Sequence, residues 1–95
     1  MQSNKLRELR NYSDPEYVMN KAKMMGLNPV HESSRKDKKY MVFDGRTMVH
    51  FRQMGYEDAT KHNDLDRINR FRKRNWKWQN SPKYSPAYLS FYLLW

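Results

Sequence analysis

Residues 39–51 read KYMVFDGRTMVHF, and this stretch has the pattern of a β-hairpin. β-Branched and aromatic residues, which favour extended backbone, stand on both sides of an Asp-Gly pair. Asp44-Gly45 tolerates the positive φ angles of a type I′ turn, so we expect two paired strands over about 39–51. Apolar residues occur on alternate and sometimes adjacent positions of both strands. At least one face of the hairpin must therefore be covered, and the segments before and after it are the candidates.

The segment before the hairpin carries the signals of one helix, over about 15–25. Ser13 or Asp14 can cap this helix, and Pro15 suits its first position. Gly26 can close its last turn, because glycine adopts the left-handed conformation at low cost.

The remaining N-terminal segments are weakly specified. Residues 31–38 are polar and are expected to form a loop or the edge of the sheet. Residues 1–11 carry two leucines among charged side chains, which allows either a short helix or an extended arm.

A basic amphipathic helix is expected over about 64–76, with Asn63 or Asp64 as its cap. At about 100° per residue, its apolar and basic side chains separate onto opposite arcs. The apolar arc contains Leu65, Ile68, Phe71 and Trp76. The basic arc contains Arg67, Arg70, Lys73, Arg74 and Lys77. Arg72 falls inside the apolar arc and should either snorkel to water or pair with a carboxylate.

A short apolar helix is expected after Ser85-Pro86, from Ala87 to Trp95. This segment is apolar nearly all round and cannot stay solvated without making an adhesive patch. We therefore expect it to act as a packing anchor, buried either in this protein or in a partner. The anchor residues are Leu89, Phe91, Leu93, Leu94 and Trp95.

The charge of the chain points to acidic or polyanionic partners. Its 95 residues include 19 Lys and Arg against 10 Asp and Glu, a formal net charge of +9. The excess is largest over residues 61–95, with eight basic and two acidic side chains. Such a field attracts nucleic acid and equally suits an acidic protein surface. The absence of cysteine excludes disulfides and thiolate metal sites, and no window is long and apolar enough to span a bilayer.

Few residues are able to support a metal or acid–base site. The candidates that lie close in sequence are His50, Glu57, Asp58, His62 and Asp64. Asp58 and His62 supply two ligands at helical spacing, whereas a metal site needs three or four. We therefore expect Asp58, Thr60 and Asp64 to cap turns and His62 to be a satisfied polar residue under the sheet. Glycine-rich phosphate loops, serine elbows and paired catalytic carboxylates are also absent, so we predict no enzyme, no metal and no cofactor.

The segment that follows the hairpin carries a recognisable motif. Its residues are Phe51, Gly55, Tyr56, Asp58, Thr60, His62 and Asp64, followed by Arg67, Arg74, Trp76, Ser90, Leu94 and Trp95. This pattern resembles a family of small proteins encoded by large double-stranded DNA viruses of eukaryotes, with relatives in marine phages. The chain departs from the family pattern at Arg52, in place of glycine, at Ala59, in place of an aromatic residue, and at Asn75, in place of histidine. The resemblance implies an origin but no activity.

The resemblance also divides the chain. Residues 38–95 are interpreted as the family core, and residues 1–37 as a lineage-specific arm and helix. Together they are expected to form a small single domain of the α+β class, with the hairpin packed by the helices before and after it.

Two functional hypotheses follow. The first is a non-enzymatic structural protein of a large DNA virus particle, a minor capsid or cement protein that binds neighbouring capsid proteins. It would be made in the host cytoplasm or viral factory and located in the virion, as the resemblance implies. The alternative is a DNA-binding or genome-packaging accessory protein, whose basic arc meets phosphates while nearby aromatic rings stack on bases.

Overall fold

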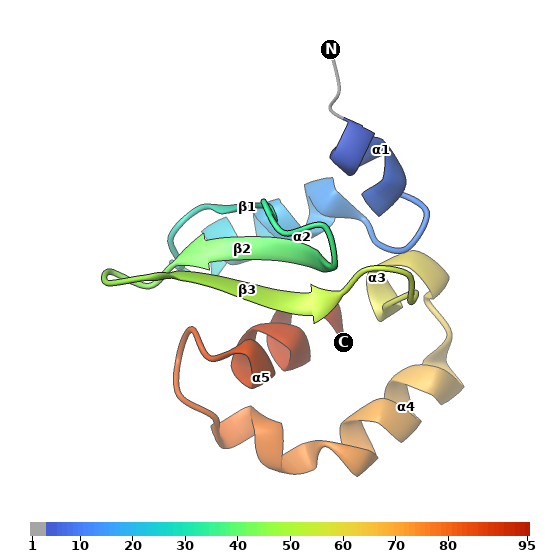
Figure 1. Ribbon diagram of the computed structural model, residues 1–95. Coiled ribbons are helices and arrows are strands. Elements are labelled where there is room, and N and C mark those ends of the chain that lie inside the picture. The colour runs from blue at the N-terminus through green and yellow to red at the C-terminus, as the bar shows by residue number, and fades with distance from the viewer. Residues whose placement is uncertain (1–3) are drawn as a thin grey trace.

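The predicted hairpin is the centre of a three-stranded antiparallel sheet in the computed structural model, which describes residues 4–95 (Figure 1). Strands β2 (Lys38–Phe43) and β3 (Met48–Gln53) form the hairpin. A short strand, β1 (Val30–Glu32), pairs with the other edge of β2. The α+β fold class expected from the sequence is confirmed.

The hairpin turn differs from the expected type I′ turn. Its central residues are Gly45 and Arg46, because the Asp44 N–H donates to the Thr47 carbonyl at 3.0 Å. Gly45 has a φ of 103°, whereas Asp44 lies outside the left-handed region, so the pair lacks the two positive φ angles of a type I′ turn. The Asp44 carboxylate accepts from the N–H groups of Arg46 and Thr47 at 2.7 and 2.8 Å. Asp44 therefore contributes to the turn through its side chain rather than through a positive φ.

Helical elements flank the sheet on both sides in sequence. They are α1 (Asn4–Leu9), α2 (Pro15–Met24), α3 (Ala59–His62), α4 (Leu65–Arg74), the 3₁₀ segment η1 (Trp76–Asn80), α5 (Pro86–Leu89) and the π-helical turn η2 (Ser90–Leu94). In Figure 1, α1 lies above the sheet and α5 below it, while α4 and η1 form an arc at the periphery.

The ends of α2 follow the local signals in the sequence. The Asp14 carboxylate accepts from the Tyr17 N–H at 3.2 Å and caps the first turn. Gly26 has a φ of 75°, and the Leu27 N–H donates to the Ala22 carbonyl at 3.0 Å. This is a Schellman ending, and it stops α2 one residue before the predicted boundary.

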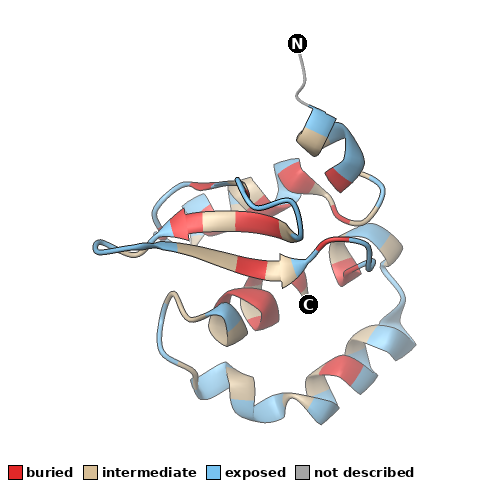
Figure 2. Cartoon of the chain, viewed as in Figure 1, coloured by how far each residue is buried: buried red, intermediate tan, exposed pale blue. Residues whose placement is uncertain are grey.

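One hydrophobic core joins the sheet to the helices before and after it (Figure 2). Its fully buried side chains include Leu9, Val18, Ala22, Tyr40, Val42, Phe51, Leu89, Leu93 and Leu94. Because these residues come from both ends of the chain, residues 1–37 and 38–95 do not pack as separate bodies where the structure describes them. Within residues 4–95, no helix combines the length and the apolar character needed to cross a bilayer.

The N-terminal segment is part of the core rather than an extended arm. Residues 1–3 lie outside the described residues, and α1 starts at the next one. Leu9 is completely buried, and the Lys5 Nζ donates to the carbonyls of Arg35 and Lys38, both at 2.6 Å. The α1 helix is therefore tied to the connection between β1 and β2.

Candidate functional site

The predicted basic residues lie on the exposed side of α4 and on η1. We call this set the α4 basic surface: Arg67, Arg70, Lys73, Arg74 and Lys77. Asp64 caps the helix, because its carboxylate accepts from the N–H groups of Asp66 and Arg67 at 3.0 and 3.3 Å. From Arg67 to Arg74 the helix advances about 10 Å, a length over which duplex DNA presents about six negative charges. The spacing suits several simultaneous phosphate contacts.

Most of the charge on this surface is not neutralised within the protein. Arg67 has an acidic neighbour, since its Nη1 lies 3.7 Å from Oε1 of Glu57. Within residues 4–95, no carboxylate lies in ion-pair distance of Arg70, Lys73 or Arg74. Three exposed cations therefore remain available to a partner.

The apolar arc predicted for this helix is wrong at both ends. Leu65 is 73% exposed and Trp76 is 55% exposed. The α-helix stops at Arg74, and Asn75, with φ −114° and ψ 28°, leads into a 3₁₀ segment of three residues per turn. This change of period rotates Trp76 out of the arc. Leu65, at the first position of α4, stays largely in solvent.

Phe71 attaches α4 to the rest of the domain. It is the buried residue of the helix, and its ring stacks on Trp95 with centroids 4.2 Å apart and planes 7° from parallel. Trp78 meets the same ring edge-on at 5.7 Å. The Phe71 ring therefore contacts Trp95 at the end of the chain through its face, and it contacts η1 through Trp78.

Among residues 4–95, no acidic side chain lies within ion-pair distance of Arg72, and its guanidinium contacts residues 91–95 instead. Its Nε donates to the main-chain oxygen of Trp95 at 3.0 Å. Its guanidinium carbon lies 4.4 Å from the centre of the Phe91 ring, which is a cation–π contact. The partners are a main-chain oxygen and an aromatic ring because residues 91–95 pack against this side of α4.

The apolar C-terminal segment is buried inside this domain. Leu89, Phe91, Leu93 and Leu94 are at most 3% exposed. Ser85 caps the segment, accepting from the Tyr88 N–H at 3.2 Å. Of the two alternatives left open by the sequence, burial in this protein is the one observed, and it removes the apolar terminus from any docking surface.

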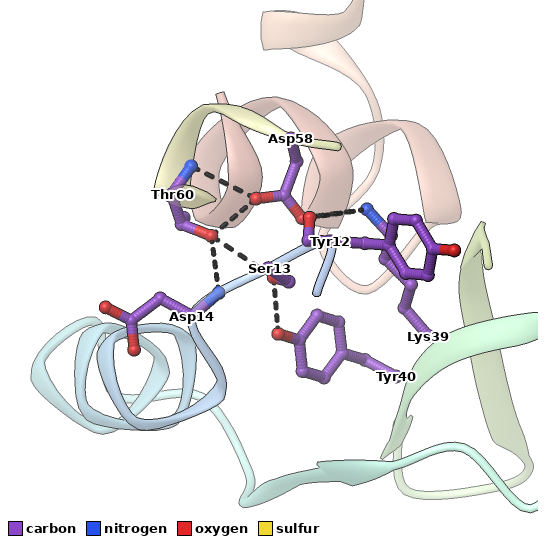
Figure 3. A network of polar contacts seen from close by, with 7 residues as sticks. All are labelled: Tyr12, Ser13, Asp14, Lys39, Tyr40, Asp58 and Thr60. Carbon is purple, nitrogen blue, oxygen red and sulfur yellow. Dashed lines mark hydrogen bonds and ion pairs between the residues drawn. The ribbon is translucent and has the colours of Figure 1, made fainter. Parts of the chain in front are cut away.

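A buried ion pair lies at the junction of β2, α3 and the loop before α2 (Figure 3). The Lys39 Nζ is 3.0 Å from Oδ2 of Asp58, and the two side chains are 2% and 1% exposed. The same Nζ donates to the Tyr12 carbonyl at 3.3 Å. Burial lowers the pKa of Lys39 from its ordinary value, and the charge of Asp58 counteracts this shift.

Thr60 extends the network to α2 and the sheet. Oδ1 of Asp58 accepts from both the N–H and the hydroxyl of Thr60, which makes Asp58 the cap of α3. The Thr60 hydroxyl accepts from the Asp14 N–H at 2.9 Å, and the Ser13 hydroxyl lies 2.6 Å from that of Tyr40. Burial raises the pKa of Tyr40 far above its ordinary value. The network has the residue types of an acid–base site, but the side chains of Lys39 and Asp58 are at most 2% exposed and bond to one another and to their neighbours.

His62 is only half satisfied, unlike the expectation. Its Nδ1 accepts from the Asp64 N–H at 2.9 Å, whereas its Nε2 is buried without a hydrogen-bond partner among residues 4–95. Burial, and then the charge of Arg67, lower the pKa of His62 below its ordinary value of 6.5. Its ring lies 5.1 Å from that of Trp95. No group of three His, Cys, Asp or Glu side chains able to hold a metal ion occurs in the described part of the chain.

The other motif residues surround the end of β3. Phe51 is buried and stacks on Tyr40 with centroids 5.7 Å apart. Gly55 has a φ of 101° and presents Tyr56, which is 66% exposed. Arg52 has a φ of 62°, a conformation that costs a bulky residue on the order of 1–3 kcal/mol. The departure from the family's glycine thus falls where the backbone favours glycine.

Sequence reasoning missed Lys39 and Arg52 as residues of interest. Lys39 lies where the charged residues 35–39 meet the apolar residues 40–43, so no local signal in the sequence marks it as buried. Its partner Asp58 is 19 residues away in the sequence, so no local pattern predicts that the two side chains meet. Arg52 was marked only by its difference from glycine.

A model of a family of unknown function (DUF5754) matches residues 29–75. The chain is similar to that family from β1 to the end of α4, a stretch that includes the buried ion pair and most of the α4 basic surface. No curated protein and no solved structure matches the chain.

Proposed function

We propose that this protein acts by binding rather than by turnover, and that the α4 basic surface docks on nucleic acid. The observation that carries this proposal is the set of cations Arg70, Lys73 and Arg74, exposed on one side of a helix without carboxylate partners among residues 4–95. Exposed charge of one sign on a rigid helix meets a linear polyanion at several points at once.

One feature favours nucleic acid over an acidic protein surface. Arginine supplies three of the five residues of the α4 basic surface, but guanidinium groups pair with phosphate and carboxylate oxygens alike and do not discriminate. The aromatic side chain beside them does. Trp76 is 55% exposed at the end of this surface, with the Lys77 Nζ 5.8 Å from its ring centre. An exposed indole beside cations is suited to contact with bases.

The order of the two hypotheses therefore changes from that favoured by the sequence. The virion-structural hypothesis drew support from an apolar terminus that needed a partner, and Leu93 and Leu94 have their partners in this domain. The near-complete burial of Lys39 and Asp58 supports a role for this pair in stability rather than in turnover.

A salt series with a fluorescent DNA duplex tests the proposal. For the wild type, the logarithm of the association constant should fall with the logarithm of salt concentration by about 0.9 per phosphate contacted. The double variant Arg70→Glu/Arg74→Glu should bind at least tenfold more weakly, with a slope shallower by about 1.8. The matched control is Arg35→Glu/Arg46→Glu, which makes the same charge change at exposed turns of the sheet. No binding of the wild type at physiological salt, or equal losses in both variants, contradicts the proposal.

A structural role in a virus particle is the second candidate, and one observation favours it. Phe43 and Met48 face each other across the hairpin and are 46% and 43% exposed. Paired exposed apolar side chains of these types are common at protein interfaces. Mass spectrometry of purified particles tests this candidate: a fixed ratio to the capsid protein supports it, and absence from the particles rejects it.

A further inference from the structure

A basic cleft lies between the end of β3 and the segment that runs from η1 to α5. Its volume is about 600 Å³, within the usual range for small-ligand sites. Lys38, Arg52, Tyr56 and Trp78 contribute to its walls, and no acidic residue does among those described. The cleft is distinct from the α4 basic surface, which supplies none of its lining residues.

Arg52 has a charge without a counter-charge. Its guanidinium carbon lies 5.6 Å from the centre of the Phe71 ring, and no carboxylate among residues 4–95 is within ion-pair distance. Asp58, the acidic group whose charge acts on Arg52, is already paired with Lys39. Burial lowers the pKa of Arg52, as expected for a cation that is partly removed from water. An anion in the cleft would supply the missing partner.

The backbone at Arg52 adds a second, independent argument. Its φ of 62° is strained for any side chain with a Cβ, and glycine would remove the strain. Residues held in such conformations concentrate at ligand sites. The conformation places the guanidinium over Phe71, beside the cleft, rather than along the sheet.

Two aromatic rings give the cleft a surface for a planar group. Tyr56 is 66% exposed, and Trp78 is half-buried and held edge-on against Phe71 at 5.7 Å. Aromatic side chains next to arginine form the stacking platforms on which proteins hold unpaired bases. A simple phosphate ion would use the cations and leave both rings without a role.

We infer that this cleft binds one unpaired nucleotide, with its phosphate on Arg52 and Lys38 and its base against Tyr56 and Trp78. The inference deepens the proposed function and rests on it for the class of partner. It adds a preference for single-stranded nucleic acid, because a base inside a duplex cannot reach the rings.

A nuclear magnetic resonance titration with thymidine monophosphate tests the cleft by itself. Taken to about 10 mM, it detects dissociation constants in the millimolar range. The indole N–H signal of Trp78 should shift, while that of Trp95, which does not line the cleft, should stay in place. Inorganic phosphate at equal concentration should leave the Trp78 signal unmoved. An unmoved Trp78 signal with the nucleotide, or the same shift with phosphate alone, overturns the inference.

The decisive variant is Arg52→Gly. It removes the guanidinium and relieves the strained φ, so the melting temperature should rise while the affinity for the nucleotide falls about tenfold or more. The matched control is Arg46→Ala, which removes one exposed arginine of the hairpin turn and should leave the affinity unchanged. Because the fold is expected to gain stability, lost binding in Arg52→Gly cannot come from unfolding. Unchanged affinity in this variant refutes the role of Arg52.

The failure of this inference and the failure of the proposed function give different results. The Arg70→Glu/Arg74→Glu variant should lose duplex binding and keep the Trp78 shift with the mononucleotide. A protein that binds duplex through α4 without a Trp78 shift rejects the cleft alone. A protein that shows the Trp78 shift but no duplex binding rejects the role of α4 alone.

Discussion

Breaking the buried pair between Lys39 and Asp58 should strongly destabilise this domain. Asp58→Asn keeps an oxygen that can accept from the Thr60 N–H, so the cap of α3 survives while the charge is removed. The Lys39 ammonium, with its side chain 2% exposed, then loses its counter-charge. Leaving one member of a buried pair uncompensated costs about 3–5 kcal/mol. For a domain of this size that lowers the melting temperature by at least about 12 °C.

A double-mutant cycle separates the pair from its surroundings. Lys39→Met replaces the ammonium with an unbranched side chain, and the double variant Lys39→Met/Asp58→Asn buries neither charge. It should be more stable than the sum of the single losses predicts, by about 1–3 kcal/mol. Urea and thermal unfolding followed by circular dichroism measure all four proteins.

The control is the exposed ion pair between Arg10 and Glu16, whose side chains are 32% and 61% exposed. Glu16→Gln should cost no more than about 1 kcal/mol, because solvent screens such pairs. The reasoning is refuted if Asp58→Asn costs as little as Glu16→Gln, or if the two single losses simply add in the double variant.

Two further predictions concern the chain end and pH. Leu94→Ala should lower the free energy of unfolding by about 2–5 kcal/mol. Leu65→Ala, at a leucine that is 73% exposed, should change it by no more than about 0.5 kcal/mol. Equal losses in urea unfolding would show that the C-terminal anchor is not packed as described. The lowered pKa of His62 means that the unfolded chain binds more protons than the folded one between the folded pKa and 6.5, so the free energy of unfolding should fall as pH drops below about 6.5. His62→Gln should flatten this pH dependence in melting curves taken from about pH 7 to about pH 5. The pKa of His50 is also lowered, so a residual slope in the same direction should remain. An unchanged slope would refute the role of His62.

The candidate site was only partly accessible to sequence reasoning. The α4 basic surface follows from periodicity, since charges three and four residues apart share one side of a helix. The exposure of Trp76 does not follow, because it depends on where the α-helix changes to a 3₁₀ segment. The cleft at Arg52 also escaped prediction, because its walls come from β2, β3, η1 and α5, and no local pattern shows that these segments meet.

The sequence by itself determined the elements whose causes are local. The strands around Asp44-Gly45, the ends of α2 at Asp14 and Gly26, and the cap at Asp64 depend on interactions between residues at most a few positions apart. Such interactions are present in the chain before it folds, which makes their signals readable. Even there, the turn at Asp44 and Gly45 did not take the expected type I′ form.

Only the tertiary structure decided which partner each long-range group would find. Lys39 was an ordinary basic residue until folding placed it against Asp58, and the terminal leucines had two equally good destinations until α2 and the sheet enclosed them. The contribution of a buried charge or apolar side chain to stability depends on the groups that pack against it in the folded protein. That environment is assembled from segments far apart in the chain, so it is a property of the fold and not of any stretch of residues.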